Sequence, residues 1–204
     1  MNTVVVDNEK VIPNKIVCIG RNYVEHIQEL NNEVPSEIVV FNKPNSAIGE
    51  RLISFHQEPI HYEAELCFLI RNGKYHAVGL GLDLTKRDLQ SKLKLKGLPW
   101  ERAKAFDNSA LFTKFIVLDE LEVNALSFQL LIDDRVTQEA NIELMMSQPN
   151  VIRDFLASYT QLQDNDIVMT GTPKGVGVVN SGSEFVLKLF SKNLLLLEQS
   201  WQAE

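Results

Sequence analysis

The 204-residue sequence has few cysteines and lacks a long apolar run. Its two cysteines, Cys18 and Cys67, each stand among apolar residues, which indicates reduced core side chains. This excludes a disulfide framework and a thiolate metal site. The longest aliphatic run, from Leu194 to Leu197, is far too short to cross a bilayer. The N-terminus shows no secretory signal pattern, so we expect a cytoplasmic protein without membrane partners.

Excess positive charge, internal repeats and linkers are also missing. The net charge is −7, which argues against a protein that binds nucleic acid or an anionic membrane. Hydrophobic residues make up 45% and charged residues 23%, as in ordinary soluble proteins. Without a linker or a low-complexity tract, the simplest expectation is one domain over residues 1–204, with residues 1–14 as an N-terminal arm.

Short runs of β-branched and aromatic residues, bounded by turn residues, predict a β-rich core with a few helices. The expected strands cover residues 3–6, 15–19, 38–42, 60–70, 76–83, 112–118, 127–133, 166–170 and 183–190. The expected helices cover residues 23–30, 86–96 and 151–159. Asn22, with Glu25 in capping-box position, is the predicted cap of the first helix, and Thr85 is the predicted cap of the second.

The strand from His61 to Ile70 carries an unusual pair of carboxylates. Side chains alternate along a strand, so Glu63 and Glu65 point the same way. The opposite face is apolar and core-like: Tyr62, Ala64, Leu66, Phe68 and Ile70. Two neighbouring carboxylates repel each other, and burial increases the cost, so a divalent cation between them is expected. The alternative is a solvated face of an edge strand.

A third carboxylate ends the next expected strand. Gly79, Gly81 and Asp83 share one face, and the two glycines would leave room for a ligand beside the carboxylate. Arg87 and Gln90 project from the first turn of the following helix. They could therefore face whatever Asp83 binds.

His26 and Glu29 are three residues apart on the first helix, so their side chains can touch. A carboxylate that orients an imidazole and raises its basicity suits a general base acting on water. The alternative is a surface pair on an exposed helix.

Positive charge is concentrated between residues 86 and 104. Most of these side chains are expected on a solvated helix face, and one or two could serve an anionic substrate. Lys104 stands apart because it lies in a mostly apolar segment. The glycine-rich loop at residues 171–177 follows a strand, and its backbone amides could meet an anion.

Six motifs, taken in order, resemble the fumarylacetoacetate hydrolase family, in particular its short branch of acylpyruvate hydrolases and oxaloacetate decarboxylases. They are Gly20-Arg21-Asn22-Tyr23 with His26 and Glu29, Phe41-Asn42-Lys43-Pro44, Tyr62-Glu63-Ala64-Glu65-Leu66, Asp83 to Gln90, Pro99-Trp100 with Lys104, and Thr170 to Gly177. The resemblance runs from about Lys15 to Gly182. It implies an α+β, mainly β fold: a mixed β-sandwich roll with flanking helices, assembled as a homodimer.

The resemblance also implies roles for individual residues. Magnesium, or manganese, would be bound by Glu63, Glu65 and Asp83. His26 and Glu29 would form a catalytic dyad, and Lys104 would be the active-site lysine. The positions implied to contact substrate are Arg21, Gln90 and Thr172, to which Arg87 is added because it follows Asp83.

The implied reaction is cleavage of a C–C bond in a 2,4-diketo acid, giving pyruvate and a carboxylic acid. Two departures from the family pattern, at residues 108–112 and 139–143, leave the choice of substrate open. The alternatives are oxaloacetate decarboxylation or keto–enol tautomerisation, and isomerisation or decarboxylation of a ring-cleavage dienoate. A non-catalytic, metal-stabilised binding module is disfavoured, since structural metal needs neither His26, Glu29 nor Lys104.

Overall fold

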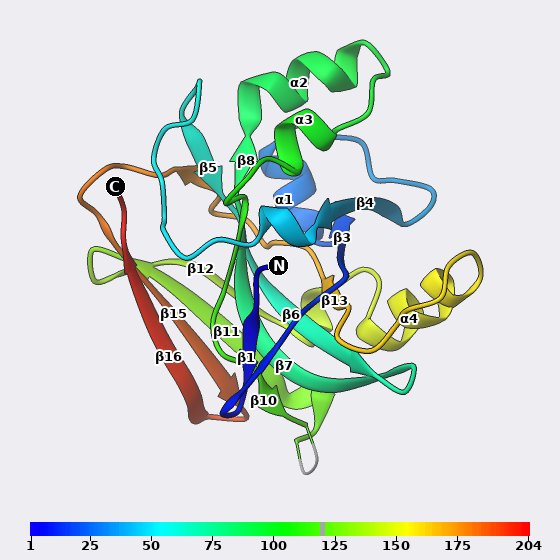
Figure 1. The fold of residues 1–204 in the computed structure, drawn as a ribbon. Coiled ribbons are helices and arrows are strands. Elements are labelled where there is room, and N and C mark those ends of the chain that lie inside the picture. The colour runs from blue at the N-terminus through cyan, green and yellow to red at the C-terminus, as the bar shows by residue number, and fades with distance from the viewer. Residues whose placement is uncertain (119–120) are drawn as a thin grey trace.

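The computed structural model describes residues 1–118 and 121–204, and Figure 1 shows a mainly β architecture. A seven-stranded sheet has the order β10-β7-β6-β13-β3-β4, with β9 also paired to β7. Its strands are β10 (Ile116–Val117), β7 (Lys74–Asp83), β6 (Ala64–Arg71), β13 (Ile167–Met169), β3 (Lys15–Gly20), β4 (Val39–Pro44) and β9 (Ala110–Phe112).

Three smaller sheets surround it. A four-stranded sheet has the order β12 (Arg135–Asn141), β11 (Leu126–Ile132), β15 (Glu184–Ser191) and β16 (Leu194–Gln202). A three-stranded sheet joins β14 (Gly177–Val178), β5 (Ile60–Tyr62) and β8 (Thr85–Lys86), and a hairpin joins β1 (Val4–Val6) and β2 (Glu9–Val11). The helices are α1 (Val24–Glu29), α2 (Arg87–Leu95), α3 (Glu101–Lys104) and α4 (Pro149–Ala157), with 3-10 turns at Asn45–Ala47, Val123–Ala125 and Ile142–Leu144.

The main core lies between the seven-stranded and the four-stranded sheets, where Leu66 and Phe68 share a cluster with Phe128 and Leu187. Helix α4 covers the same sheet further along. The opposite face carries Cys18 and Cys67, packed beneath the β1–β2 hairpin. Both cysteines are buried and free, as predicted. The predicted mixed β roll with flanking helices is therefore the fold that forms.

The directions of four strands bring one end of each strand to the same edge of the seven-stranded sheet. β3 and β13 are parallel, β6 is antiparallel to β13, and β7 is antiparallel to β6. The ends of β3, β13 and β7 therefore meet the beginning of β6. Helices α2 and α3 stand over this edge, at the top of Figure 1. Among the described residues, no helix combines the length and apolar character that a membrane crossing requires.

The predicted strand over residues 60–70 is broken at Glu63. The chain leaves the three-stranded sheet after Tyr62 and enters the seven-stranded sheet at Ala64. A register shift between Leu69 and Ile70 also moves Ile70 into the cluster beneath α4. The alternation of faces is correct for the residues from Tyr62 to Phe68. The alternation of apolar and polar residues does not indicate that the chain passes from one sheet to another.

Both predicted helix caps are wrong. Helix α1 begins after Tyr23, without a side-chain cap, and the Asn22 amide instead donates to the carbonyl oxygens of Ser147 and Thr170 at 2.9 and 2.8 Å. Helix α2 begins after Lys86, also without a side-chain cap. The Thr85 hydroxyl donates to the Asp83 carbonyl at 3.2 Å. The Asn22 side chain thus forms tertiary hydrogen bonds in place of a cap, and the Thr85 hydroxyl also accepts a tertiary hydrogen bond, from Lys104 Nζ at 2.6 Å.

The face of β7 that carries Gly79 and Gly81 is closely packed against other side chains. The prediction that these glycines leave room for a ligand is therefore wrong. A Cβ atom on Gly81 would lie 2.9 Å from Cys67 Sγ and 3.0 Å from the Phe112 ring. On Gly79 it would lie 3.2 Å from the Phe115 ring. Aromatic side chains thus occupy the space that the glycines leave.

Other differences concern boundaries and missed strands. The run expected as one strand over residues 112–118 is divided between β9 and β10. The last helix covers Pro149–Ala157, about two residues earlier than expected. Strands β2, β12 and β16 were not predicted. Strand β2 has no buried residue, β12 combines an exposed Val136 with a buried Gln138, and β16 begins with the exposed Leu194 and Leu195.

Candidate metal centre and active site

Three buried carboxylates meet at the shared edge of the strands. Glu63, Glu65 and Asp83 are 6%, 1% and 0% exposed. Each can offer an oxygen such that all three lie within 4.8 Å of one another. Glu63 occupies the break between β5 and β6, Glu65 is paired with Gly81 on β7, and Asp83 ends β7. The carboxylates predicted from strand alternation therefore come together in three dimensions.

Glu63 has two cationic partners. Lys104, at the end of α3, donates to Glu63 Oε2 at 2.8 Å and to Asp83 Oδ2 at 2.6 Å. The Arg87 guanidinium donates to Glu63 Oε1. Burial alone would raise the pKa of Glu63, but Lys104 and Arg87 outweigh it and hold the pKa well below its usual range. Burial opposes the charge of Lys104, yet Asp83 and Glu63 raise the pKa of that ammonium.

Glu65 has no ion-pair partner among the described residues. It accepts a hydrogen bond from the Gly171 amide at 2.7 Å. Burial, followed by the charges of Asp83 and Glu63, raises the pKa of Glu65 well above its usual range. The triad therefore lacks positive charge on the side of Glu65.

Asp83 offers a second unsatisfied position. Its Oδ1 atom is buried and has no hydrogen-bond partner, although Lys43 Nζ lies 2.8 Å away. The three hydrogens of the Lys43 ammonium are directed to the carbonyl oxygens of Leu84, Lys104 and Ser109. Asp83 Oδ1 and the uncompensated Glu65 are oxygen ligands of the kind that Mg²⁺ and Mn²⁺ prefer, so the residues present fit a hard divalent cation.

The histidine and glutamate predicted as a dyad are in contact. His26 Nδ1 lies 3.3 Å from Glu29 Oε2. Glu29 is held in turn by the Gly175 amide, at 3.0 and 3.2 Å from its two oxygens. Burial lowers the pKa of His26, and this outweighs the opposite effects of Glu63 and Glu29. A neutral imidazole oriented through Nδ1 leaves Nε2 available to accept a proton.

The glycine-rich loop uses its amides as predicted, toward protein carboxylates. The Gly171 amide reaches Glu65 and the Gly175 amide reaches Glu29, so one loop links the triad to the dyad. Gly171 and Gly175 have φ values of +95° and +96°. This left-handed backbone favours glycine, which explains the composition of the loop.

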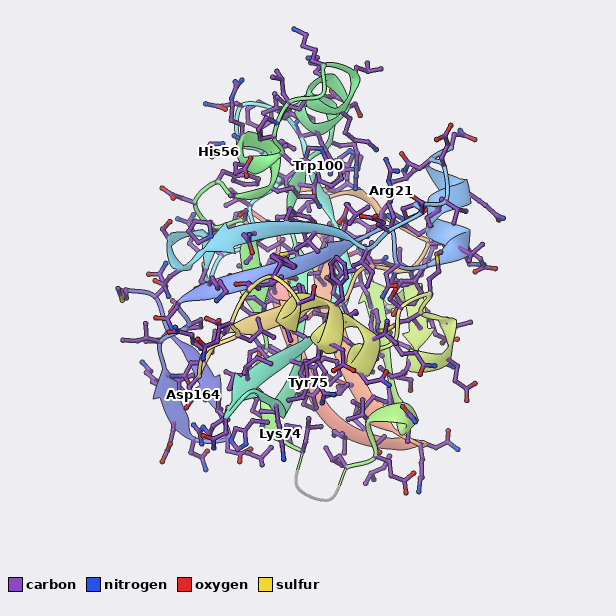
Figure 2. All side chains as sticks on the ribbon, turned by 90° about the vertical axis from the view of Figure 1, so that its right-hand side faces the viewer. Arg21, His56, Lys74, Tyr75, Trp100 and Asp164 are labelled. Carbon is purple, nitrogen blue, oxygen red and sulfur yellow. The ribbon has the colours of Figure 1, made fainter. Side chains whose placement is uncertain are left out.

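The residues predicted to contact substrate line one pocket with Glu63 and Glu65 of the triad, together with His26 and Lys104. They are Arg21, Arg87, Gln90 and Thr172. Arg87 donates to Gln90 Oε1 at 2.8 Å. The Thr172 hydroxyl donates to the Ala64 carbonyl at 2.9 Å. Figure 2 shows Arg21 and Trp100 near one another at the upper side of the molecule, where both border this pocket.

Sequence reasoning assigned no role to Lys43 or Gln138, although both are buried beside the site. The signal for Lys43 was a lysine within an apolar strand. Gln138, on β12, accepts from the Ala64 amide at 3.0 Å and donates to Thr172 at 2.9 Å, so it fixes the start of β6. Nothing in its local sequence indicated burial.

Residues 15–198 match the model of the fumarylacetoacetate (FAA) hydrolase C-terminal family. This chain belongs to that family. The match covers the triad, the dyad and Lys104, so the resemblance seen in six short motifs extends over most of the chain.

Known relatives share about a third of the sequence. The oxaloacetate tautomerase YcgM of Escherichia coli (strain K12) is 34% identical over 190 residues, or 85% of this chain and 87% of the relative. The mitochondrial oxaloacetate decarboxylase of Dictyostelium discoideum is 34% identical over 185 residues, covering 82% and 85%. Fumarylpyruvate hydrolase from Pseudomonas aeruginosa, solved with Mn²⁺ and pyruvate, superposes with a TM-score of 0.88 at 26% identity, covering 99% and 95%.

Proposed function

We propose that this protein is an enzyme that interconverts the keto and enol forms of oxaloacetate, and decarboxylates it, with a divalent cation. The observation that carries the proposal is the buried triad with Lys104, in which, among the described residues, Glu65 has no ion-pair partner and Asp83 Oδ1 accepts no hydrogen bond. Relatives named for oxaloacetate chemistry support this choice over acylpyruvate hydrolysis, the first expectation from the sequence.

Glu63, Glu65 and Asp83 would hold the cation. When bound, it would supply positive charge that polarises the keto group and stabilises an enolate. Lys104 adds a second cation beside the same oxygens, at 2.8 Å from Glu63 and 2.6 Å from Asp83. Arg87 holds Glu63 in its ionised form and contributes further positive charge for an anionic keto acid.

His26 would move the proton in tautomerisation. Nε2 accepts the proton from C3, the electron pair of that C–H bond forms the C2–C3 double bond, and Lys104 gives a proton to the keto oxygen. Glu29 orients the imidazole and stabilises its charged form. In decarboxylation the C3–C4 bond breaks, carbon dioxide leaves, and the electron pair of that bond forms the C2–C3 double bond of the pyruvate enolate, which then takes up a proton at C3. No proton has to be removed first, so that step depends less on His26.

Acylpyruvate hydrolysis is the second candidate, and the His26–Glu29 contact favours it. There His26 would take a proton from the water that attacks the distal carbonyl. A protein of this fold, the fumarylpyruvate hydrolase of Pseudomonas aeruginosa, is named as a hydrolase and was solved in complex with Mn²⁺ and pyruvate.

Side-by-side assays test the proposal. Oxaloacetate tautomerisation, oxaloacetate decarboxylation, acetylpyruvate hydrolysis and turnover of a hydroxy-dienoate are measured with Mg²⁺, with Mn²⁺ and with a chelator. We expect metal-dependent turnover of oxaloacetate, abolished in Glu65→Gln. The variant His26→Ala should lose about 10²- to 10⁴-fold in tautomerisation and hydrolysis, and much less in decarboxylation.

Two results would count against these assignments. Turnover that continues without metal would exclude the role given to the cation, and no turnover of any substrate would favour the binding module. Equal losses in all reactions of His26→Ala would exclude proton transfer by His26.

Three further properties belong to the same proposal. Magnesium is the expected ion in the cell, the protein is expected to form a homodimer, and it is expected in the cytoplasm. Metal analysis of the purified protein, light scattering and cell fractionation test them in turn.

A further inference from the structure

Two cations in the pocket wall have no carboxylate partner. Lys43, Lys104 and Arg87 each pair with the triad. Arg21 and Lys94 line the same pocket, yet neither forms an ion pair within the described part of the chain. Their charge is therefore surplus to what the triad requires.

The geometry of α2 explains how Lys94 reaches this pocket. Arg87, Gln90 and Lys94 are spaced by three and four residues, so they lie on one stripe of the helix. Seven residues of helix advance about 10 Å along its axis. Lys94 therefore lines the pocket about two helical turns beyond Arg87, whose guanidinium contacts Glu63. Lys92, on the same helix, is exposed and does not line the pocket.

Among the described residues, the hydrogen bonds of Lys94 and Arg21 go to uncharged oxygens. Lys94 Nζ donates to Asn32 Oδ1 at 2.7 Å and lies 5.9 Å from the centre of the Trp100 ring. Arg21 Nη1 donates to the Glu33 carbonyl at 3.4 Å, and Arg21 Nε is buried without a partner. Burial, with the nearby charges of Arg21 and Arg87, lowers the pKa of Lys94, so an anion at this place would relieve an unfavourable accumulation of positive charge.

The pocket is narrow, with a volume of about 40 Å³. A keto acid that enters it meets Lys94 and Arg21 on its wall. Lys94 and Arg21 can exchange a neutral oxygen for a carboxylate, which makes a stronger, charge-assisted hydrogen bond.

We propose that Lys94, with Arg21 beside it, binds the distal carboxylate of a dicarboxylic 2-keto acid. This inference rests on the proposed function, because it places the keto end of the substrate at the triad. It makes Lys94 the residue that distinguishes diacids from keto acids with a neutral tail.

The test compares oxaloacetate with its 4-ethyl ester, which keeps the keto–enol unit and lacks the distal charge. In Lys94→Met we expect kcat/KM for tautomerisation of oxaloacetate to fall about 10- to 100-fold. The value for the ester should change less than about threefold. Lys94→Arg should recover most of the loss, and Lys92→Met, with the same change in net charge on the same helix, should behave as wild type.

An equal loss with both substrates, or no loss with oxaloacetate, would overturn the assignment. If the wild-type protein turns over neither compound, the proposed function fails, and binding decides the inference instead. Calorimetry in Mg²⁺ then gives the Kd of oxaloacetate and of pyruvate. Weaker binding of oxaloacetate alone in Lys94→Met supports the inference, whereas matched values for Lys94→Met and Lys92→Met overturn it.

Discussion

Lys43 and Lys104 show how single buried cations shape this site. Both are almost fully buried, and both approach Asp83. Lys104 donates to the carboxylate oxygens themselves, whereas Lys43 donates to backbone carbonyls, including that of Lys104. Lys43 therefore positions the segment that carries Lys104. Its ammonium also lies 2.8 Å from Asp83 Oδ1, so it adds positive charge beside the triad.

The position of His26 gives a pH prediction at the residue scale. Burial lowers the pKa of His26 below its ordinary value of 6.5. Tautomerisation needs the neutral imidazole, so activity is present above the folded-state pKa and is lost as the pH falls through it. We expect the acid limb of kcat/KM against pH, measured in saturating Mg²⁺, to have its midpoint below 6.5.

Glu29 provides the matched variant for that profile. Its hydrogen bond and charge raise the pKa of His26, so Glu29→Gln should move the acid limb to still lower pH and reduce the plateau rate. A limb that stays in place, or moves to higher pH, would show that His26 is not the titrating base.

At the scale of elements, the site depends on where strands end. Glu63 lies where the chain changes sheets, Asp83 ends β7, and Gly171 follows β13. The Asp83 amide donates to the Glu63 carbonyl at 2.8 Å, which fixes two of the proposed ligands relative to each other through the backbone. Ligands placed in this way are preorganised by strand pairing, so the rigid sheet sets the geometry of the triad.

The close packing of β7 against β9 predicts a stability effect. In Gly81→Ala the new Cβ would lie 2.9 Å from Cys67 Sγ. The free energy of unfolding of this variant should therefore be about 1–3 kcal/mol lower than that of wild type. Urea denaturation measures this. Adding Phe112→Leu should recover part of the loss, because it removes the second crowded neighbour at 3.0 Å.

If Gly81 instead left space for a ligand, the result would differ. Stability would be unchanged in Gly81→Ala, and the affinity for Mg²⁺ or the KM for oxaloacetate would change.

At the scale of the whole molecule, the proposed metal binding by the buried triad would be coupled to folding. A ligand that binds only the folded state at a hundred times its Kd stabilises that state by about 2.7 kcal/mol. For a chain of this size we expect a rise in Tm of about 5–10 °C with Mn²⁺ or Mg²⁺, measured by calorimetry.

The variant Glu65→Gln separates two effects on stability. It removes a ligand, so the metal-dependent rise in Tm should be lost. Without metal it also removes like-charge repulsion among three buried carboxylates, so its Tm should be equal to or above that of wild type. A metal-free Tm well below wild type would show that Glu65 is needed for folding itself.

The amino-acid sequence by itself determined the mainly β class, the alternation that points Glu63 and Glu65 one way, and the contact between His26 and Glu29. These features depend on neighbours within four residues, where strand and helix periodicity act. Short motifs in fixed order were also enough to indicate the family. The sequence patterns were wrong for Asn22, Thr85 and the glycines of β7. Asn22 donates to Thr170, Thr85 accepts from Lys104, and Gly81 packs against Phe112, and all of these partners are distant in the chain.

Only the tertiary structure decided how charge is balanced in the site. Lys43 comes from β4, Gln138 from β12 and Lys94 from α2, and each acts through residues far away in the sequence. A buried charge or amide is stable only where distant chain segments complete its hydrogen bonds. Those bonds depend on sheet order and strand direction, which no local pattern specifies.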